Sequence, residues 1–149
     1  MLHPFTAHFA VALPLLATVL SLAFLLLKKE YLSRSSTHAV VLGAVAMVFA
    51  YFTGNTTGYD VWESVSKDAQ ALIEAHAEFG LYVLIIIVVS AAIKLFACIK
   101  KNMIAEVVAL VLLVISSAMI LNQDKMGGEL VYTYAAGVEK QAEISTLKE

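Results

Sequence analysis

Residues 1–27 read MLHPFTAHFAVALPLLATVLSLAFLLL and set the class of this protein. They contain no Asp, Glu, Lys or Arg. A helix that crosses the apolar core of a bilayer needs about 20 residues of this kind. A secretory signal would carry a positive residue before its apolar run, and none precedes Lys28. We therefore expect a retained transmembrane helix over about residues 4–27.

The same apolar character runs through the whole chain of 149 residues. Hydrophobic residues make up 60%, charged residues only 15%, and the mean hydropathy is +0.83. Further apolar stretches predict spans at about residues 38–54, 75–99 and 103–121. We expect an all-α integral membrane protein, with one four-helix up-down-up-down bundle over residues 1–138 and a polar tail over residues 139–149.

The charged residues predict how the bundle is oriented. Loops 28–38 and 94–106 hold six of the ten basic residues, and the opposite end holds ten of the twelve acidic ones. Cytoplasmic loops carry an excess of Lys and Arg, so both termini are expected on the periplasmic side of a bacterial inner membrane. Residues 59–78 are hydrophilic and predict a loop on that side, with a helix starting at about residues 66–69. Lys94 is expected to snorkel to the cytoplasmic interface.

Three of the four histidines, His3, His8 and His76, fall at the outer end in this topology. Helices one and three are diagonal neighbours at roughly 12–14 Å, about the gap that a haem held by two histidines fills. His8 and His76 are expected at similar depth, so the sequence predicts haem b between them. His3 lies about 140° around the helix from His8 and could serve a second metal, a haem propionate or a helix cap.

Other readings of these residues stay open. Phe9 could flank a macrocycle and Gly80 could leave space against it, although ordinary packing explains both. The histidines could instead bind copper or zinc, or hold no ligand. His38 has no partner histidine at its end and is read as interfacial. Cys98 is the single cysteine, and the chain has no Cys-x-x-Cys-His, which excludes covalently attached haem.

The ends of the chain carry motifs in common with a known family. The matching residues are His3-Pro4-x-x-x-His8-Phe9, Thr53-Gly54 with Gly58-Tyr59-Asp60, His76 with Gly80, and Gly127-Gly128-Glu129-Leu130-Val131-Tyr132 with Gly137-Val138. On these residues the chain resembles a bacterial membrane family catalogued as domain of unknown function 2231. The resemblance implies four spans and, because some members are joined to Rieske-type or cytochrome modules, a redox role. It also places Tyr134 where the family pattern has a histidine, and a tyrosinate can ligate haem iron.

The combined expectation is an electron-transfer membrane protein rather than a stand-alone enzyme. Its partners would be the lipid bilayer and a quinol, a cytochrome or another redox protein. A different class remains open: a non-redox accessory or assembly subunit of a larger membrane complex or homo-oligomer. Such a subunit would dock through a stripe of small residues at Ala46, Ala50, Gly54 and Gly58. No motif for nucleotide or nucleic-acid binding is present.

Overall fold

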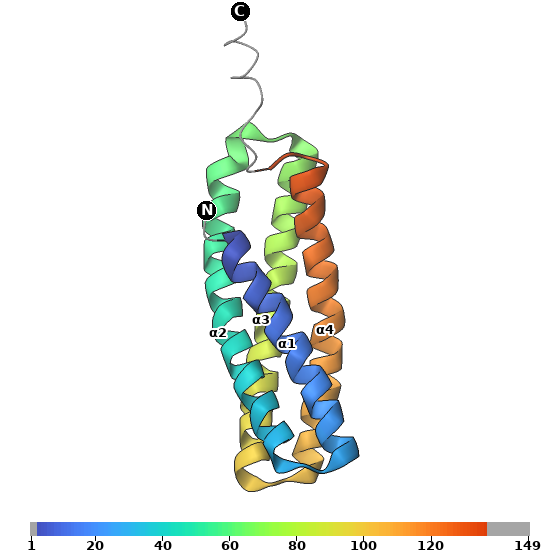
Figure 1. Ribbon diagram of the computed structural model, residues 1–149. Helices are drawn as coiled ribbons and strands as arrows, with labels where there is room; N and C mark the ends of the chain where they lie inside the picture. The colour runs from blue at the N-terminus through green and yellow to red at the C-terminus, as the bar shows by residue number, and fades with distance from the viewer. Residues whose placement is uncertain (1–2, 137–149) are drawn as a thin grey trace, which may run out of the picture.

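The computed structural model describes residues 3–136 as four antiparallel helices joined by short connections (Figure 1). They are α1 (His3–Leu27), α2 (Glu30–Val61), α3 (Lys67–Lys100) and α4 (Met103–Tyr132), with a short 3-10 helix η1 (Trp62–Ser64) after α2. Each α-helix is long and apolar enough to cross a membrane. The expected all-α four-helix bundle is confirmed.

The connection between α2 and α3 is much shorter than the sequence indicated. The expected helix start at about residues 66–69 is confirmed, because α3 begins at Lys67, but the loop expected from residue 59 is shorter than predicted, because α2 continues to Val61 and η1 follows it. Ser66 caps α3 by accepting a hydrogen bond from the amide of Ala69 (3.3 Å). The side-chain amide of Gln70 donates to the carbonyl of Trp62 (2.8 Å) and ties the two helices together. Polar residues here cover the exposed face of a helix instead of forming a loop.

A two-residue turn joins α3 to α4 and fixes their register. Lys101 adopts the left-handed conformation (φ 50°), and the amide of Asn102 donates to the carbonyl of Ala97 (3.0 Å). The side chain of Asn102 accepts from the amide of Ala105 (3.0 Å) and caps α4. Residues equally far from this turn on α3 and α4 therefore face each other.

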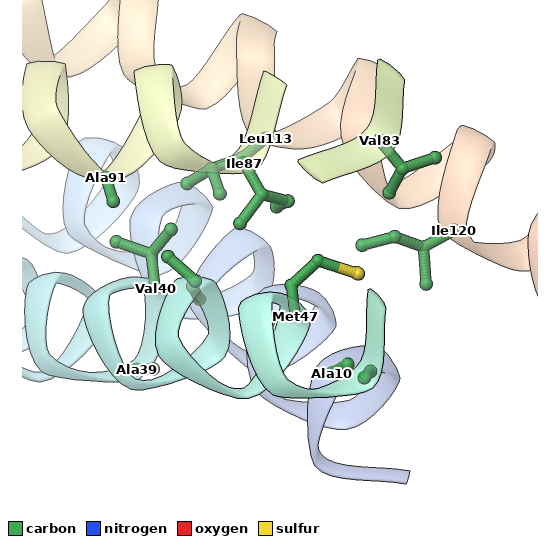
Figure 2. Packing of buried hydrophobic residues seen from close by; sticks show 12 residues of the cluster. Ala10, Ala39, Val40, Met47, Val83, Ile87, Ala91, Leu113 and Ile120 are labelled. Carbon is green, nitrogen blue, oxygen red and sulfur yellow. The ribbon is translucent and has the colours of Figure 1, made fainter. Parts of the chain in front are cut away.

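Inward-facing positions alternate in steps of three and four residues, the seven-residue repeat of coiled-coil packing. On α3 these buried or half-buried positions are Ala69, Ile73, His76, Gly80, Val83, Ile87, Ser90, Lys94 and Ala97. On α4 they are Glu106, Ala109, Leu113, Ser116, Ile120, Gln123, Gly127 and Leu130. Figure 2 shows larger apolar side chains from different helices meeting in the middle of the bundle, among them Met47 of α2, Ile87 of α3 and Ile120 of α4.

Small side chains bring the helices into close contact. A Cβ added at Gly43 of α2 would lie only 2.9 Å from Cδ of Pro14 on α1. Packing of this kind, rather than hydrophobic exclusion of water, drives helix association in lipid. The outward faces carry large apolar side chains instead, such as Leu16, Val19, Phe49, Ile85, Val111 and Val114. A lipid environment suits this exterior.

The helices are arranged so that α1 lies diagonally across from α3. α1 packs against α2 and α4, and α3 packs against the same two helices. α1 is the shortest of the four and crosses the others at a tilt (Figure 1). His3 at its start lies beside Ala50 of α2. α2 continues for about 16 Å beyond that level, at about 1.5 Å per residue.

Lys94 does not snorkel to the interface, so that expectation is wrong. Its side chain is fully buried, and its ammonium forms an ion pair with Glu106, which is 3% exposed. The ammonium also donates to the hydroxyl of Ser33 (3.2 Å), and that hydroxyl donates to the second oxygen of Glu106 (2.5 Å). The ring of Phe24 lies 5.5 Å from the ammonium. The buried carboxylate of Glu106, on the other side of the α3–α4 turn, stabilises this charge in place of water.

Candidate functional site

His3 is the histidine of α1 that points into the bundle. Its Nδ1 lies 2.9 Å from the carbonyl oxygen of Ala50 on α2. A carbonyl only accepts hydrogen bonds, so Nδ1 carries the proton and Nε2 of the neutral ring keeps its lone pair. Gly54 makes room for the ring, because a Cβ at that position would lie 2.8 Å from Cε1 of His3. Glycine at position 54 therefore leaves the space that the His3 imidazole occupies.

His76 reaches the same end of the interior from α3. It is half-buried, and its Nδ1 is buried without a hydrogen-bond partner among residues 3–136. It lies close enough to His3 for charges on the two rings to interact electrostatically. A Cβ at Gly127 of α4 would lie 3.4 Å from Cε1 of His76. One histidine from each of two diagonal helices thus lies at the same end of the bundle interior.

His8 lies on the other face of α1, away from this pair. Its ring is exposed, and its Nδ1 donates to the carbonyl of Pro4 on its own helix (2.5 Å). Phe9 is also exposed and packs edge-to-face against Phe5, with ring centroids 5.2 Å apart. The expected pairing of His8 with His76 is therefore not the arrangement that the structure has. The expectation considered how far along the helix His8 lies, but the direction of its side chain decides whether it can face His76.

Gly80 leaves no open space for a ligand, because another side chain fills it. A Cβ at Gly80 would lie 3.0 Å from Nε2 of Gln123 on α4, and that nitrogen donates to the backbone carbonyl of His76 (2.9 Å). Oε1 of Gln123 is buried without a partner in the described part of the chain. Sequence reasoning missed Gln123, although it occupies an inward position of the α4 repeat at the level of His76.

Two further candidates lie elsewhere in the chain. Tyr134 is half-buried in the turn that follows α4. His38 is exposed near the start of α2, at the opposite end. Within residues 3–136 no group of three or more His, Cys, Asp or Glu side chains is placed to hold a metal ion. The candidate site therefore contains two imidazoles, His3 and His76, and polar groups that surround them.

A cavity of about 230 Å³ lies at the far end of the bundle from the two histidines. Its walls come from all four helices, with Phe24, Cys98 and Met103 among the apolar residues and Lys28 and Arg34 among the charged ones. It reaches the buried Glu106. None of the residues that line this cavity belongs to the histidine pair.

The fold and its apolar exterior define an integral membrane protein with four transmembrane helices. The chain belongs to the family described as "Predicted membrane protein (DUF2231)", whose model matches residues 1–140. The resemblance based on the motifs at the two ends of the chain is confirmed. No curated protein and no solved structure matches the chain.

Proposed function

We propose that this protein transfers electrons in the membrane and holds the iron of a b-type haem between His3 and His76. The observation that carries the proposal is the placement of these two histidines, from diagonal helices, at one end of the bundle: the His3 ring is hydrogen-bonded to Ala50, and Nδ1 of His76 is buried without a partner among residues 3–136. Buried polar atoms in folded proteins are nearly always hydrogen-bonded, and an exception calls for a ligand or water that completes it.

The chemistry of the two side chains fits an axial pair. Histidines that ligate metals usually donate the other ring N–H to a carbonyl or a similar acceptor, which fixes the tautomer. The bond from His3 to Ala50 has this form and leaves Nε2 as the ligand atom. The apolar interior excludes water and disfavours a charged imidazolium, which keeps a ligating nitrogen available.

A bound haem would supply one-electron chemistry, and the chain would supply its position and surroundings. Gly54 on α2 lies where a Cβ would collide with the His3 ring, and Gly127 on α4 lies beside the His76 ring. Because the Gln123 amide fills the space beside Gly80, a macrocycle at this level would require that side chain to move aside.

Orientation and partners follow from the distribution of charge. Even without the buried Lys94, the end opposite the histidines carries Lys28, Lys29, Arg34, Lys100 and Lys101 against one exposed acid, Glu30. We infer that this end faces the cytoplasm of a bacterial inner membrane. The histidine pair then lies toward the periplasmic side, within reach of a quinol, a cytochrome or another periplasmic redox protein.

A copper or zinc ion at the same two histidines is the second candidate. The close packing around His3 and His76 favours it, because a single ion displaces fewer side chains than a macrocycle does. Imidazole nitrogen suits both metals.

Haem and metal analysis of the full-length protein, purified in detergent after expression with ample haem, tests these proposals. A pyridine haemochrome assay giving about one haem b per chain supports the cytochrome. Copper or zinc at similar stoichiometry, without haem, supports the second candidate. Absence of both would overturn the two proposals and leave the role of an accessory subunit in a membrane complex. The Lys94→Met/Glu106→Leu variant is a suitable control, since it alters polar residues far from the histidines.

A further inference from the structure

The cavity at the end of the bundle opposite the histidines lies where two connections between helices come together. The α1–α2 and α3–α4 connections are both at this end (Figure 1). The cavity has a volume of about 230 Å³, and part of its lining is buried: Phe24, Ser33, Ala97 and Glu106. The other lining residues are exposed or half-buried, so the cavity opens to the surface at this end.

The exposed part of the lining carries an excess of positive charge. Its cations are three exposed side chains, Lys28, Arg34 and Lys101. The acids are the exposed Glu30 and the buried Glu106, and Glu106 is already paired with Lys94. Three exposed cations against one exposed carboxylate leave a net charge of +2. The electrostatics of this cavity therefore favour an anion as its ligand.

The three cations differ in the partners that they already have. Oxygens of the Glu30 carboxylate lie 2.7 Å from the ammonium of Lys101 and 3.7 Å from the guanidinium of Arg34. These pairs are exposed to solvent and contribute little to stability, so an anion can share the same cations. Lys28 forms no ion pair among residues 3–136, and its ammonium donates to the sulfur of Met103 (3.8 Å), a weak acceptor. Lys28 thus has the most to gain from a bound anion.

Two of these cations occupy backbone positions that favour glycine. Lys28 and Lys101 have φ values of 54° and 50°, directly after α1 and after the last residue of α3. Residues with a Cβ are disfavoured in this left-handed region, and glycine is the usual residue just past the end of a helix. Both turns therefore bear the conformational cost of a lysine, and both place that lysine in the lining of the same cavity.

Much of the remaining lining is apolar and adjoins the exterior that suits lipid. Phe24, Cys98 and Met103 contribute to the lining. Leu27 and Ile99, next in sequence to lining residues, are 61% and 67% exposed on the outer surface. A strongly hydrated phosphate ion gains nothing from apolar walls, whereas a phospholipid carries a charged phosphate and apolar chains in one molecule. The lining therefore matches a lipid better than a free ion.

We propose that this cavity binds the headgroup of an anionic phospholipid, with its phosphodiester against the three exposed cations. The glycerol of the headgroup lies against Phe24 and Met103. Basic pockets between transmembrane helices recognise such headgroups. A volume of about 230 Å³ is below the range for drug-sized ligands, about 300–1,000 Å³, so the headgroup enters and the acyl chains stay along the outer faces of the helices. This site goes beyond the proposed function, because it needs neither haem nor metal.

Lipid binding to the full-length protein in a non-ionic detergent tests the proposal. Native mass spectrometry should show a single dioleoyl phosphatidylglycerol bound per chain. Dioleoyl phosphatidylcholine, which has the same chains and no net charge, should bind much more weakly. Lys28→Gly/Lys101→Gly should weaken phosphatidylglycerol binding about 30-fold, because each basic residue near an anionic headgroup contributes about fivefold. Glycine suits both backbone positions, so this variant should keep its helical content and its unfolding midpoint.

A matched control removes the same charge from the same end of the bundle. Lys29→Ser/Lys100→Ala replaces the two neighbouring lysines, neither of which lines the cavity. Its affinity for phosphatidylglycerol should change by less than about threefold, since exposed charges away from the ligand are screened at physiological salt. Equal losses in the two double variants, or equal binding of the two lipids, would overturn the proposal.

Cys98 locates the lipid, because it is the single cysteine of the chain and lines the cavity. Labelling of its thiol by a small methanethiosulfonate reagent should slow when phosphatidylglycerol is added, and this protection should be lost in Lys28→Gly/Lys101→Gly. Phosphatidylcholine and inorganic phosphate should not protect it. Protection by inorganic phosphate equal to that by the lipid would indicate an ion site and contradict a lipid headgroup. Phosphatidylglycerol that binds without protecting Cys98 would contradict the assignment to this cavity. Neither measurement depends on haem or metal, so its outcome is separate from that of the proposed function.

Discussion

Replacing Glu106 by Leu should destabilise the bundle strongly, because it leaves the ammonium of Lys94 buried without its counter-ion. Among residues 3–136 the ammonium would keep the Ser33 hydroxyl and the ring of Phe24. Two unit charges about 3 Å apart attract by about 5 kcal/mol at an effective dielectric constant of about 20. Removing one partner of a buried pair costs about 3–5 kcal/mol. The unfolded chain in a micelle also finds polar partners, so we expect a loss of about 3 kcal/mol.

Unfolding by SDS in mixed micelles, followed by far-UV circular dichroism, measures this free energy. The double variant Lys94→Met/Glu106→Leu should recover most of the loss, since an apolar pair of similar volume carries no stranded charge. Lys101→Met is the matched control, because it removes the partner of the exposed Glu30 at the same end of the bundle and should change little. A loss below about 1 kcal/mol in Glu106→Leu, or a double variant no more stable than the single one, would refute the burial argument.

Four further substitutions, one of them a control, test the contacts between the helices. Gly43→Ala should cost about 1–3 kcal/mol in the same titration, because the rigid Pro14 ring lies 2.9 Å from the added Cβ. Gly128→Ala, whose nearest neighbour is 3.9 Å away, should not be destabilising, and an equal loss in both variants would contradict this. Gly54→Ala should displace His3 and reduce bound haem or metal without changing helical content; full occupancy would argue against the His3 site. Thr18→Val removes the bond to Ser117 (2.8 Å) and should cost about 0.6 kcal/mol, typical of hydrogen bonds between membrane helices.

Much of the fold was predictable from the sequence, and the position of Lys94 shows where prediction failed. The length of each apolar stretch predicts the four helices, because a segment that crosses lipid must form its backbone hydrogen bonds within itself. Lys94 lacks a local partner, so a snorkelling side chain was the natural expectation. The signal missed was Glu106, twelve residues later on the other side of a two-residue turn. That spacing places the two side chains opposite each other in a tight antiparallel hairpin.

The choice between His3 and His8 depended on how α1 is rotated, which apolar content does not reveal. Small and buried positions on this helix, Ala10, Pro14, Ala17, Ser21 and Phe24, follow steps of three and four. Continued toward the N-terminus, this repeat includes His3 and omits His8. The same repeat selects His76 on α3 and Gln123 on α4. The repeat does not show which of these inward polar groups contact each other, or that Gln123 fills the space beside Gly80. Those contacts depend on how two helices pack together, which the sequence of one helix does not reveal.

The most direct test of the histidine pair is the dithionite-reduced minus oxidised visible spectrum of the purified protein and its single-histidine variants. We predict a b-type spectrum in wild type and in His8→Ala, because His8 is exposed and bonded to its own helix. The spectrum should be lost or converted to that of a five-coordinate haem in His3→Ala and in His76→Ala. A spectrum that survives in His3→Ala and disappears in His8→Ala would contradict the assignment of the ligands, and a featureless wild-type spectrum would contradict the cytochrome itself.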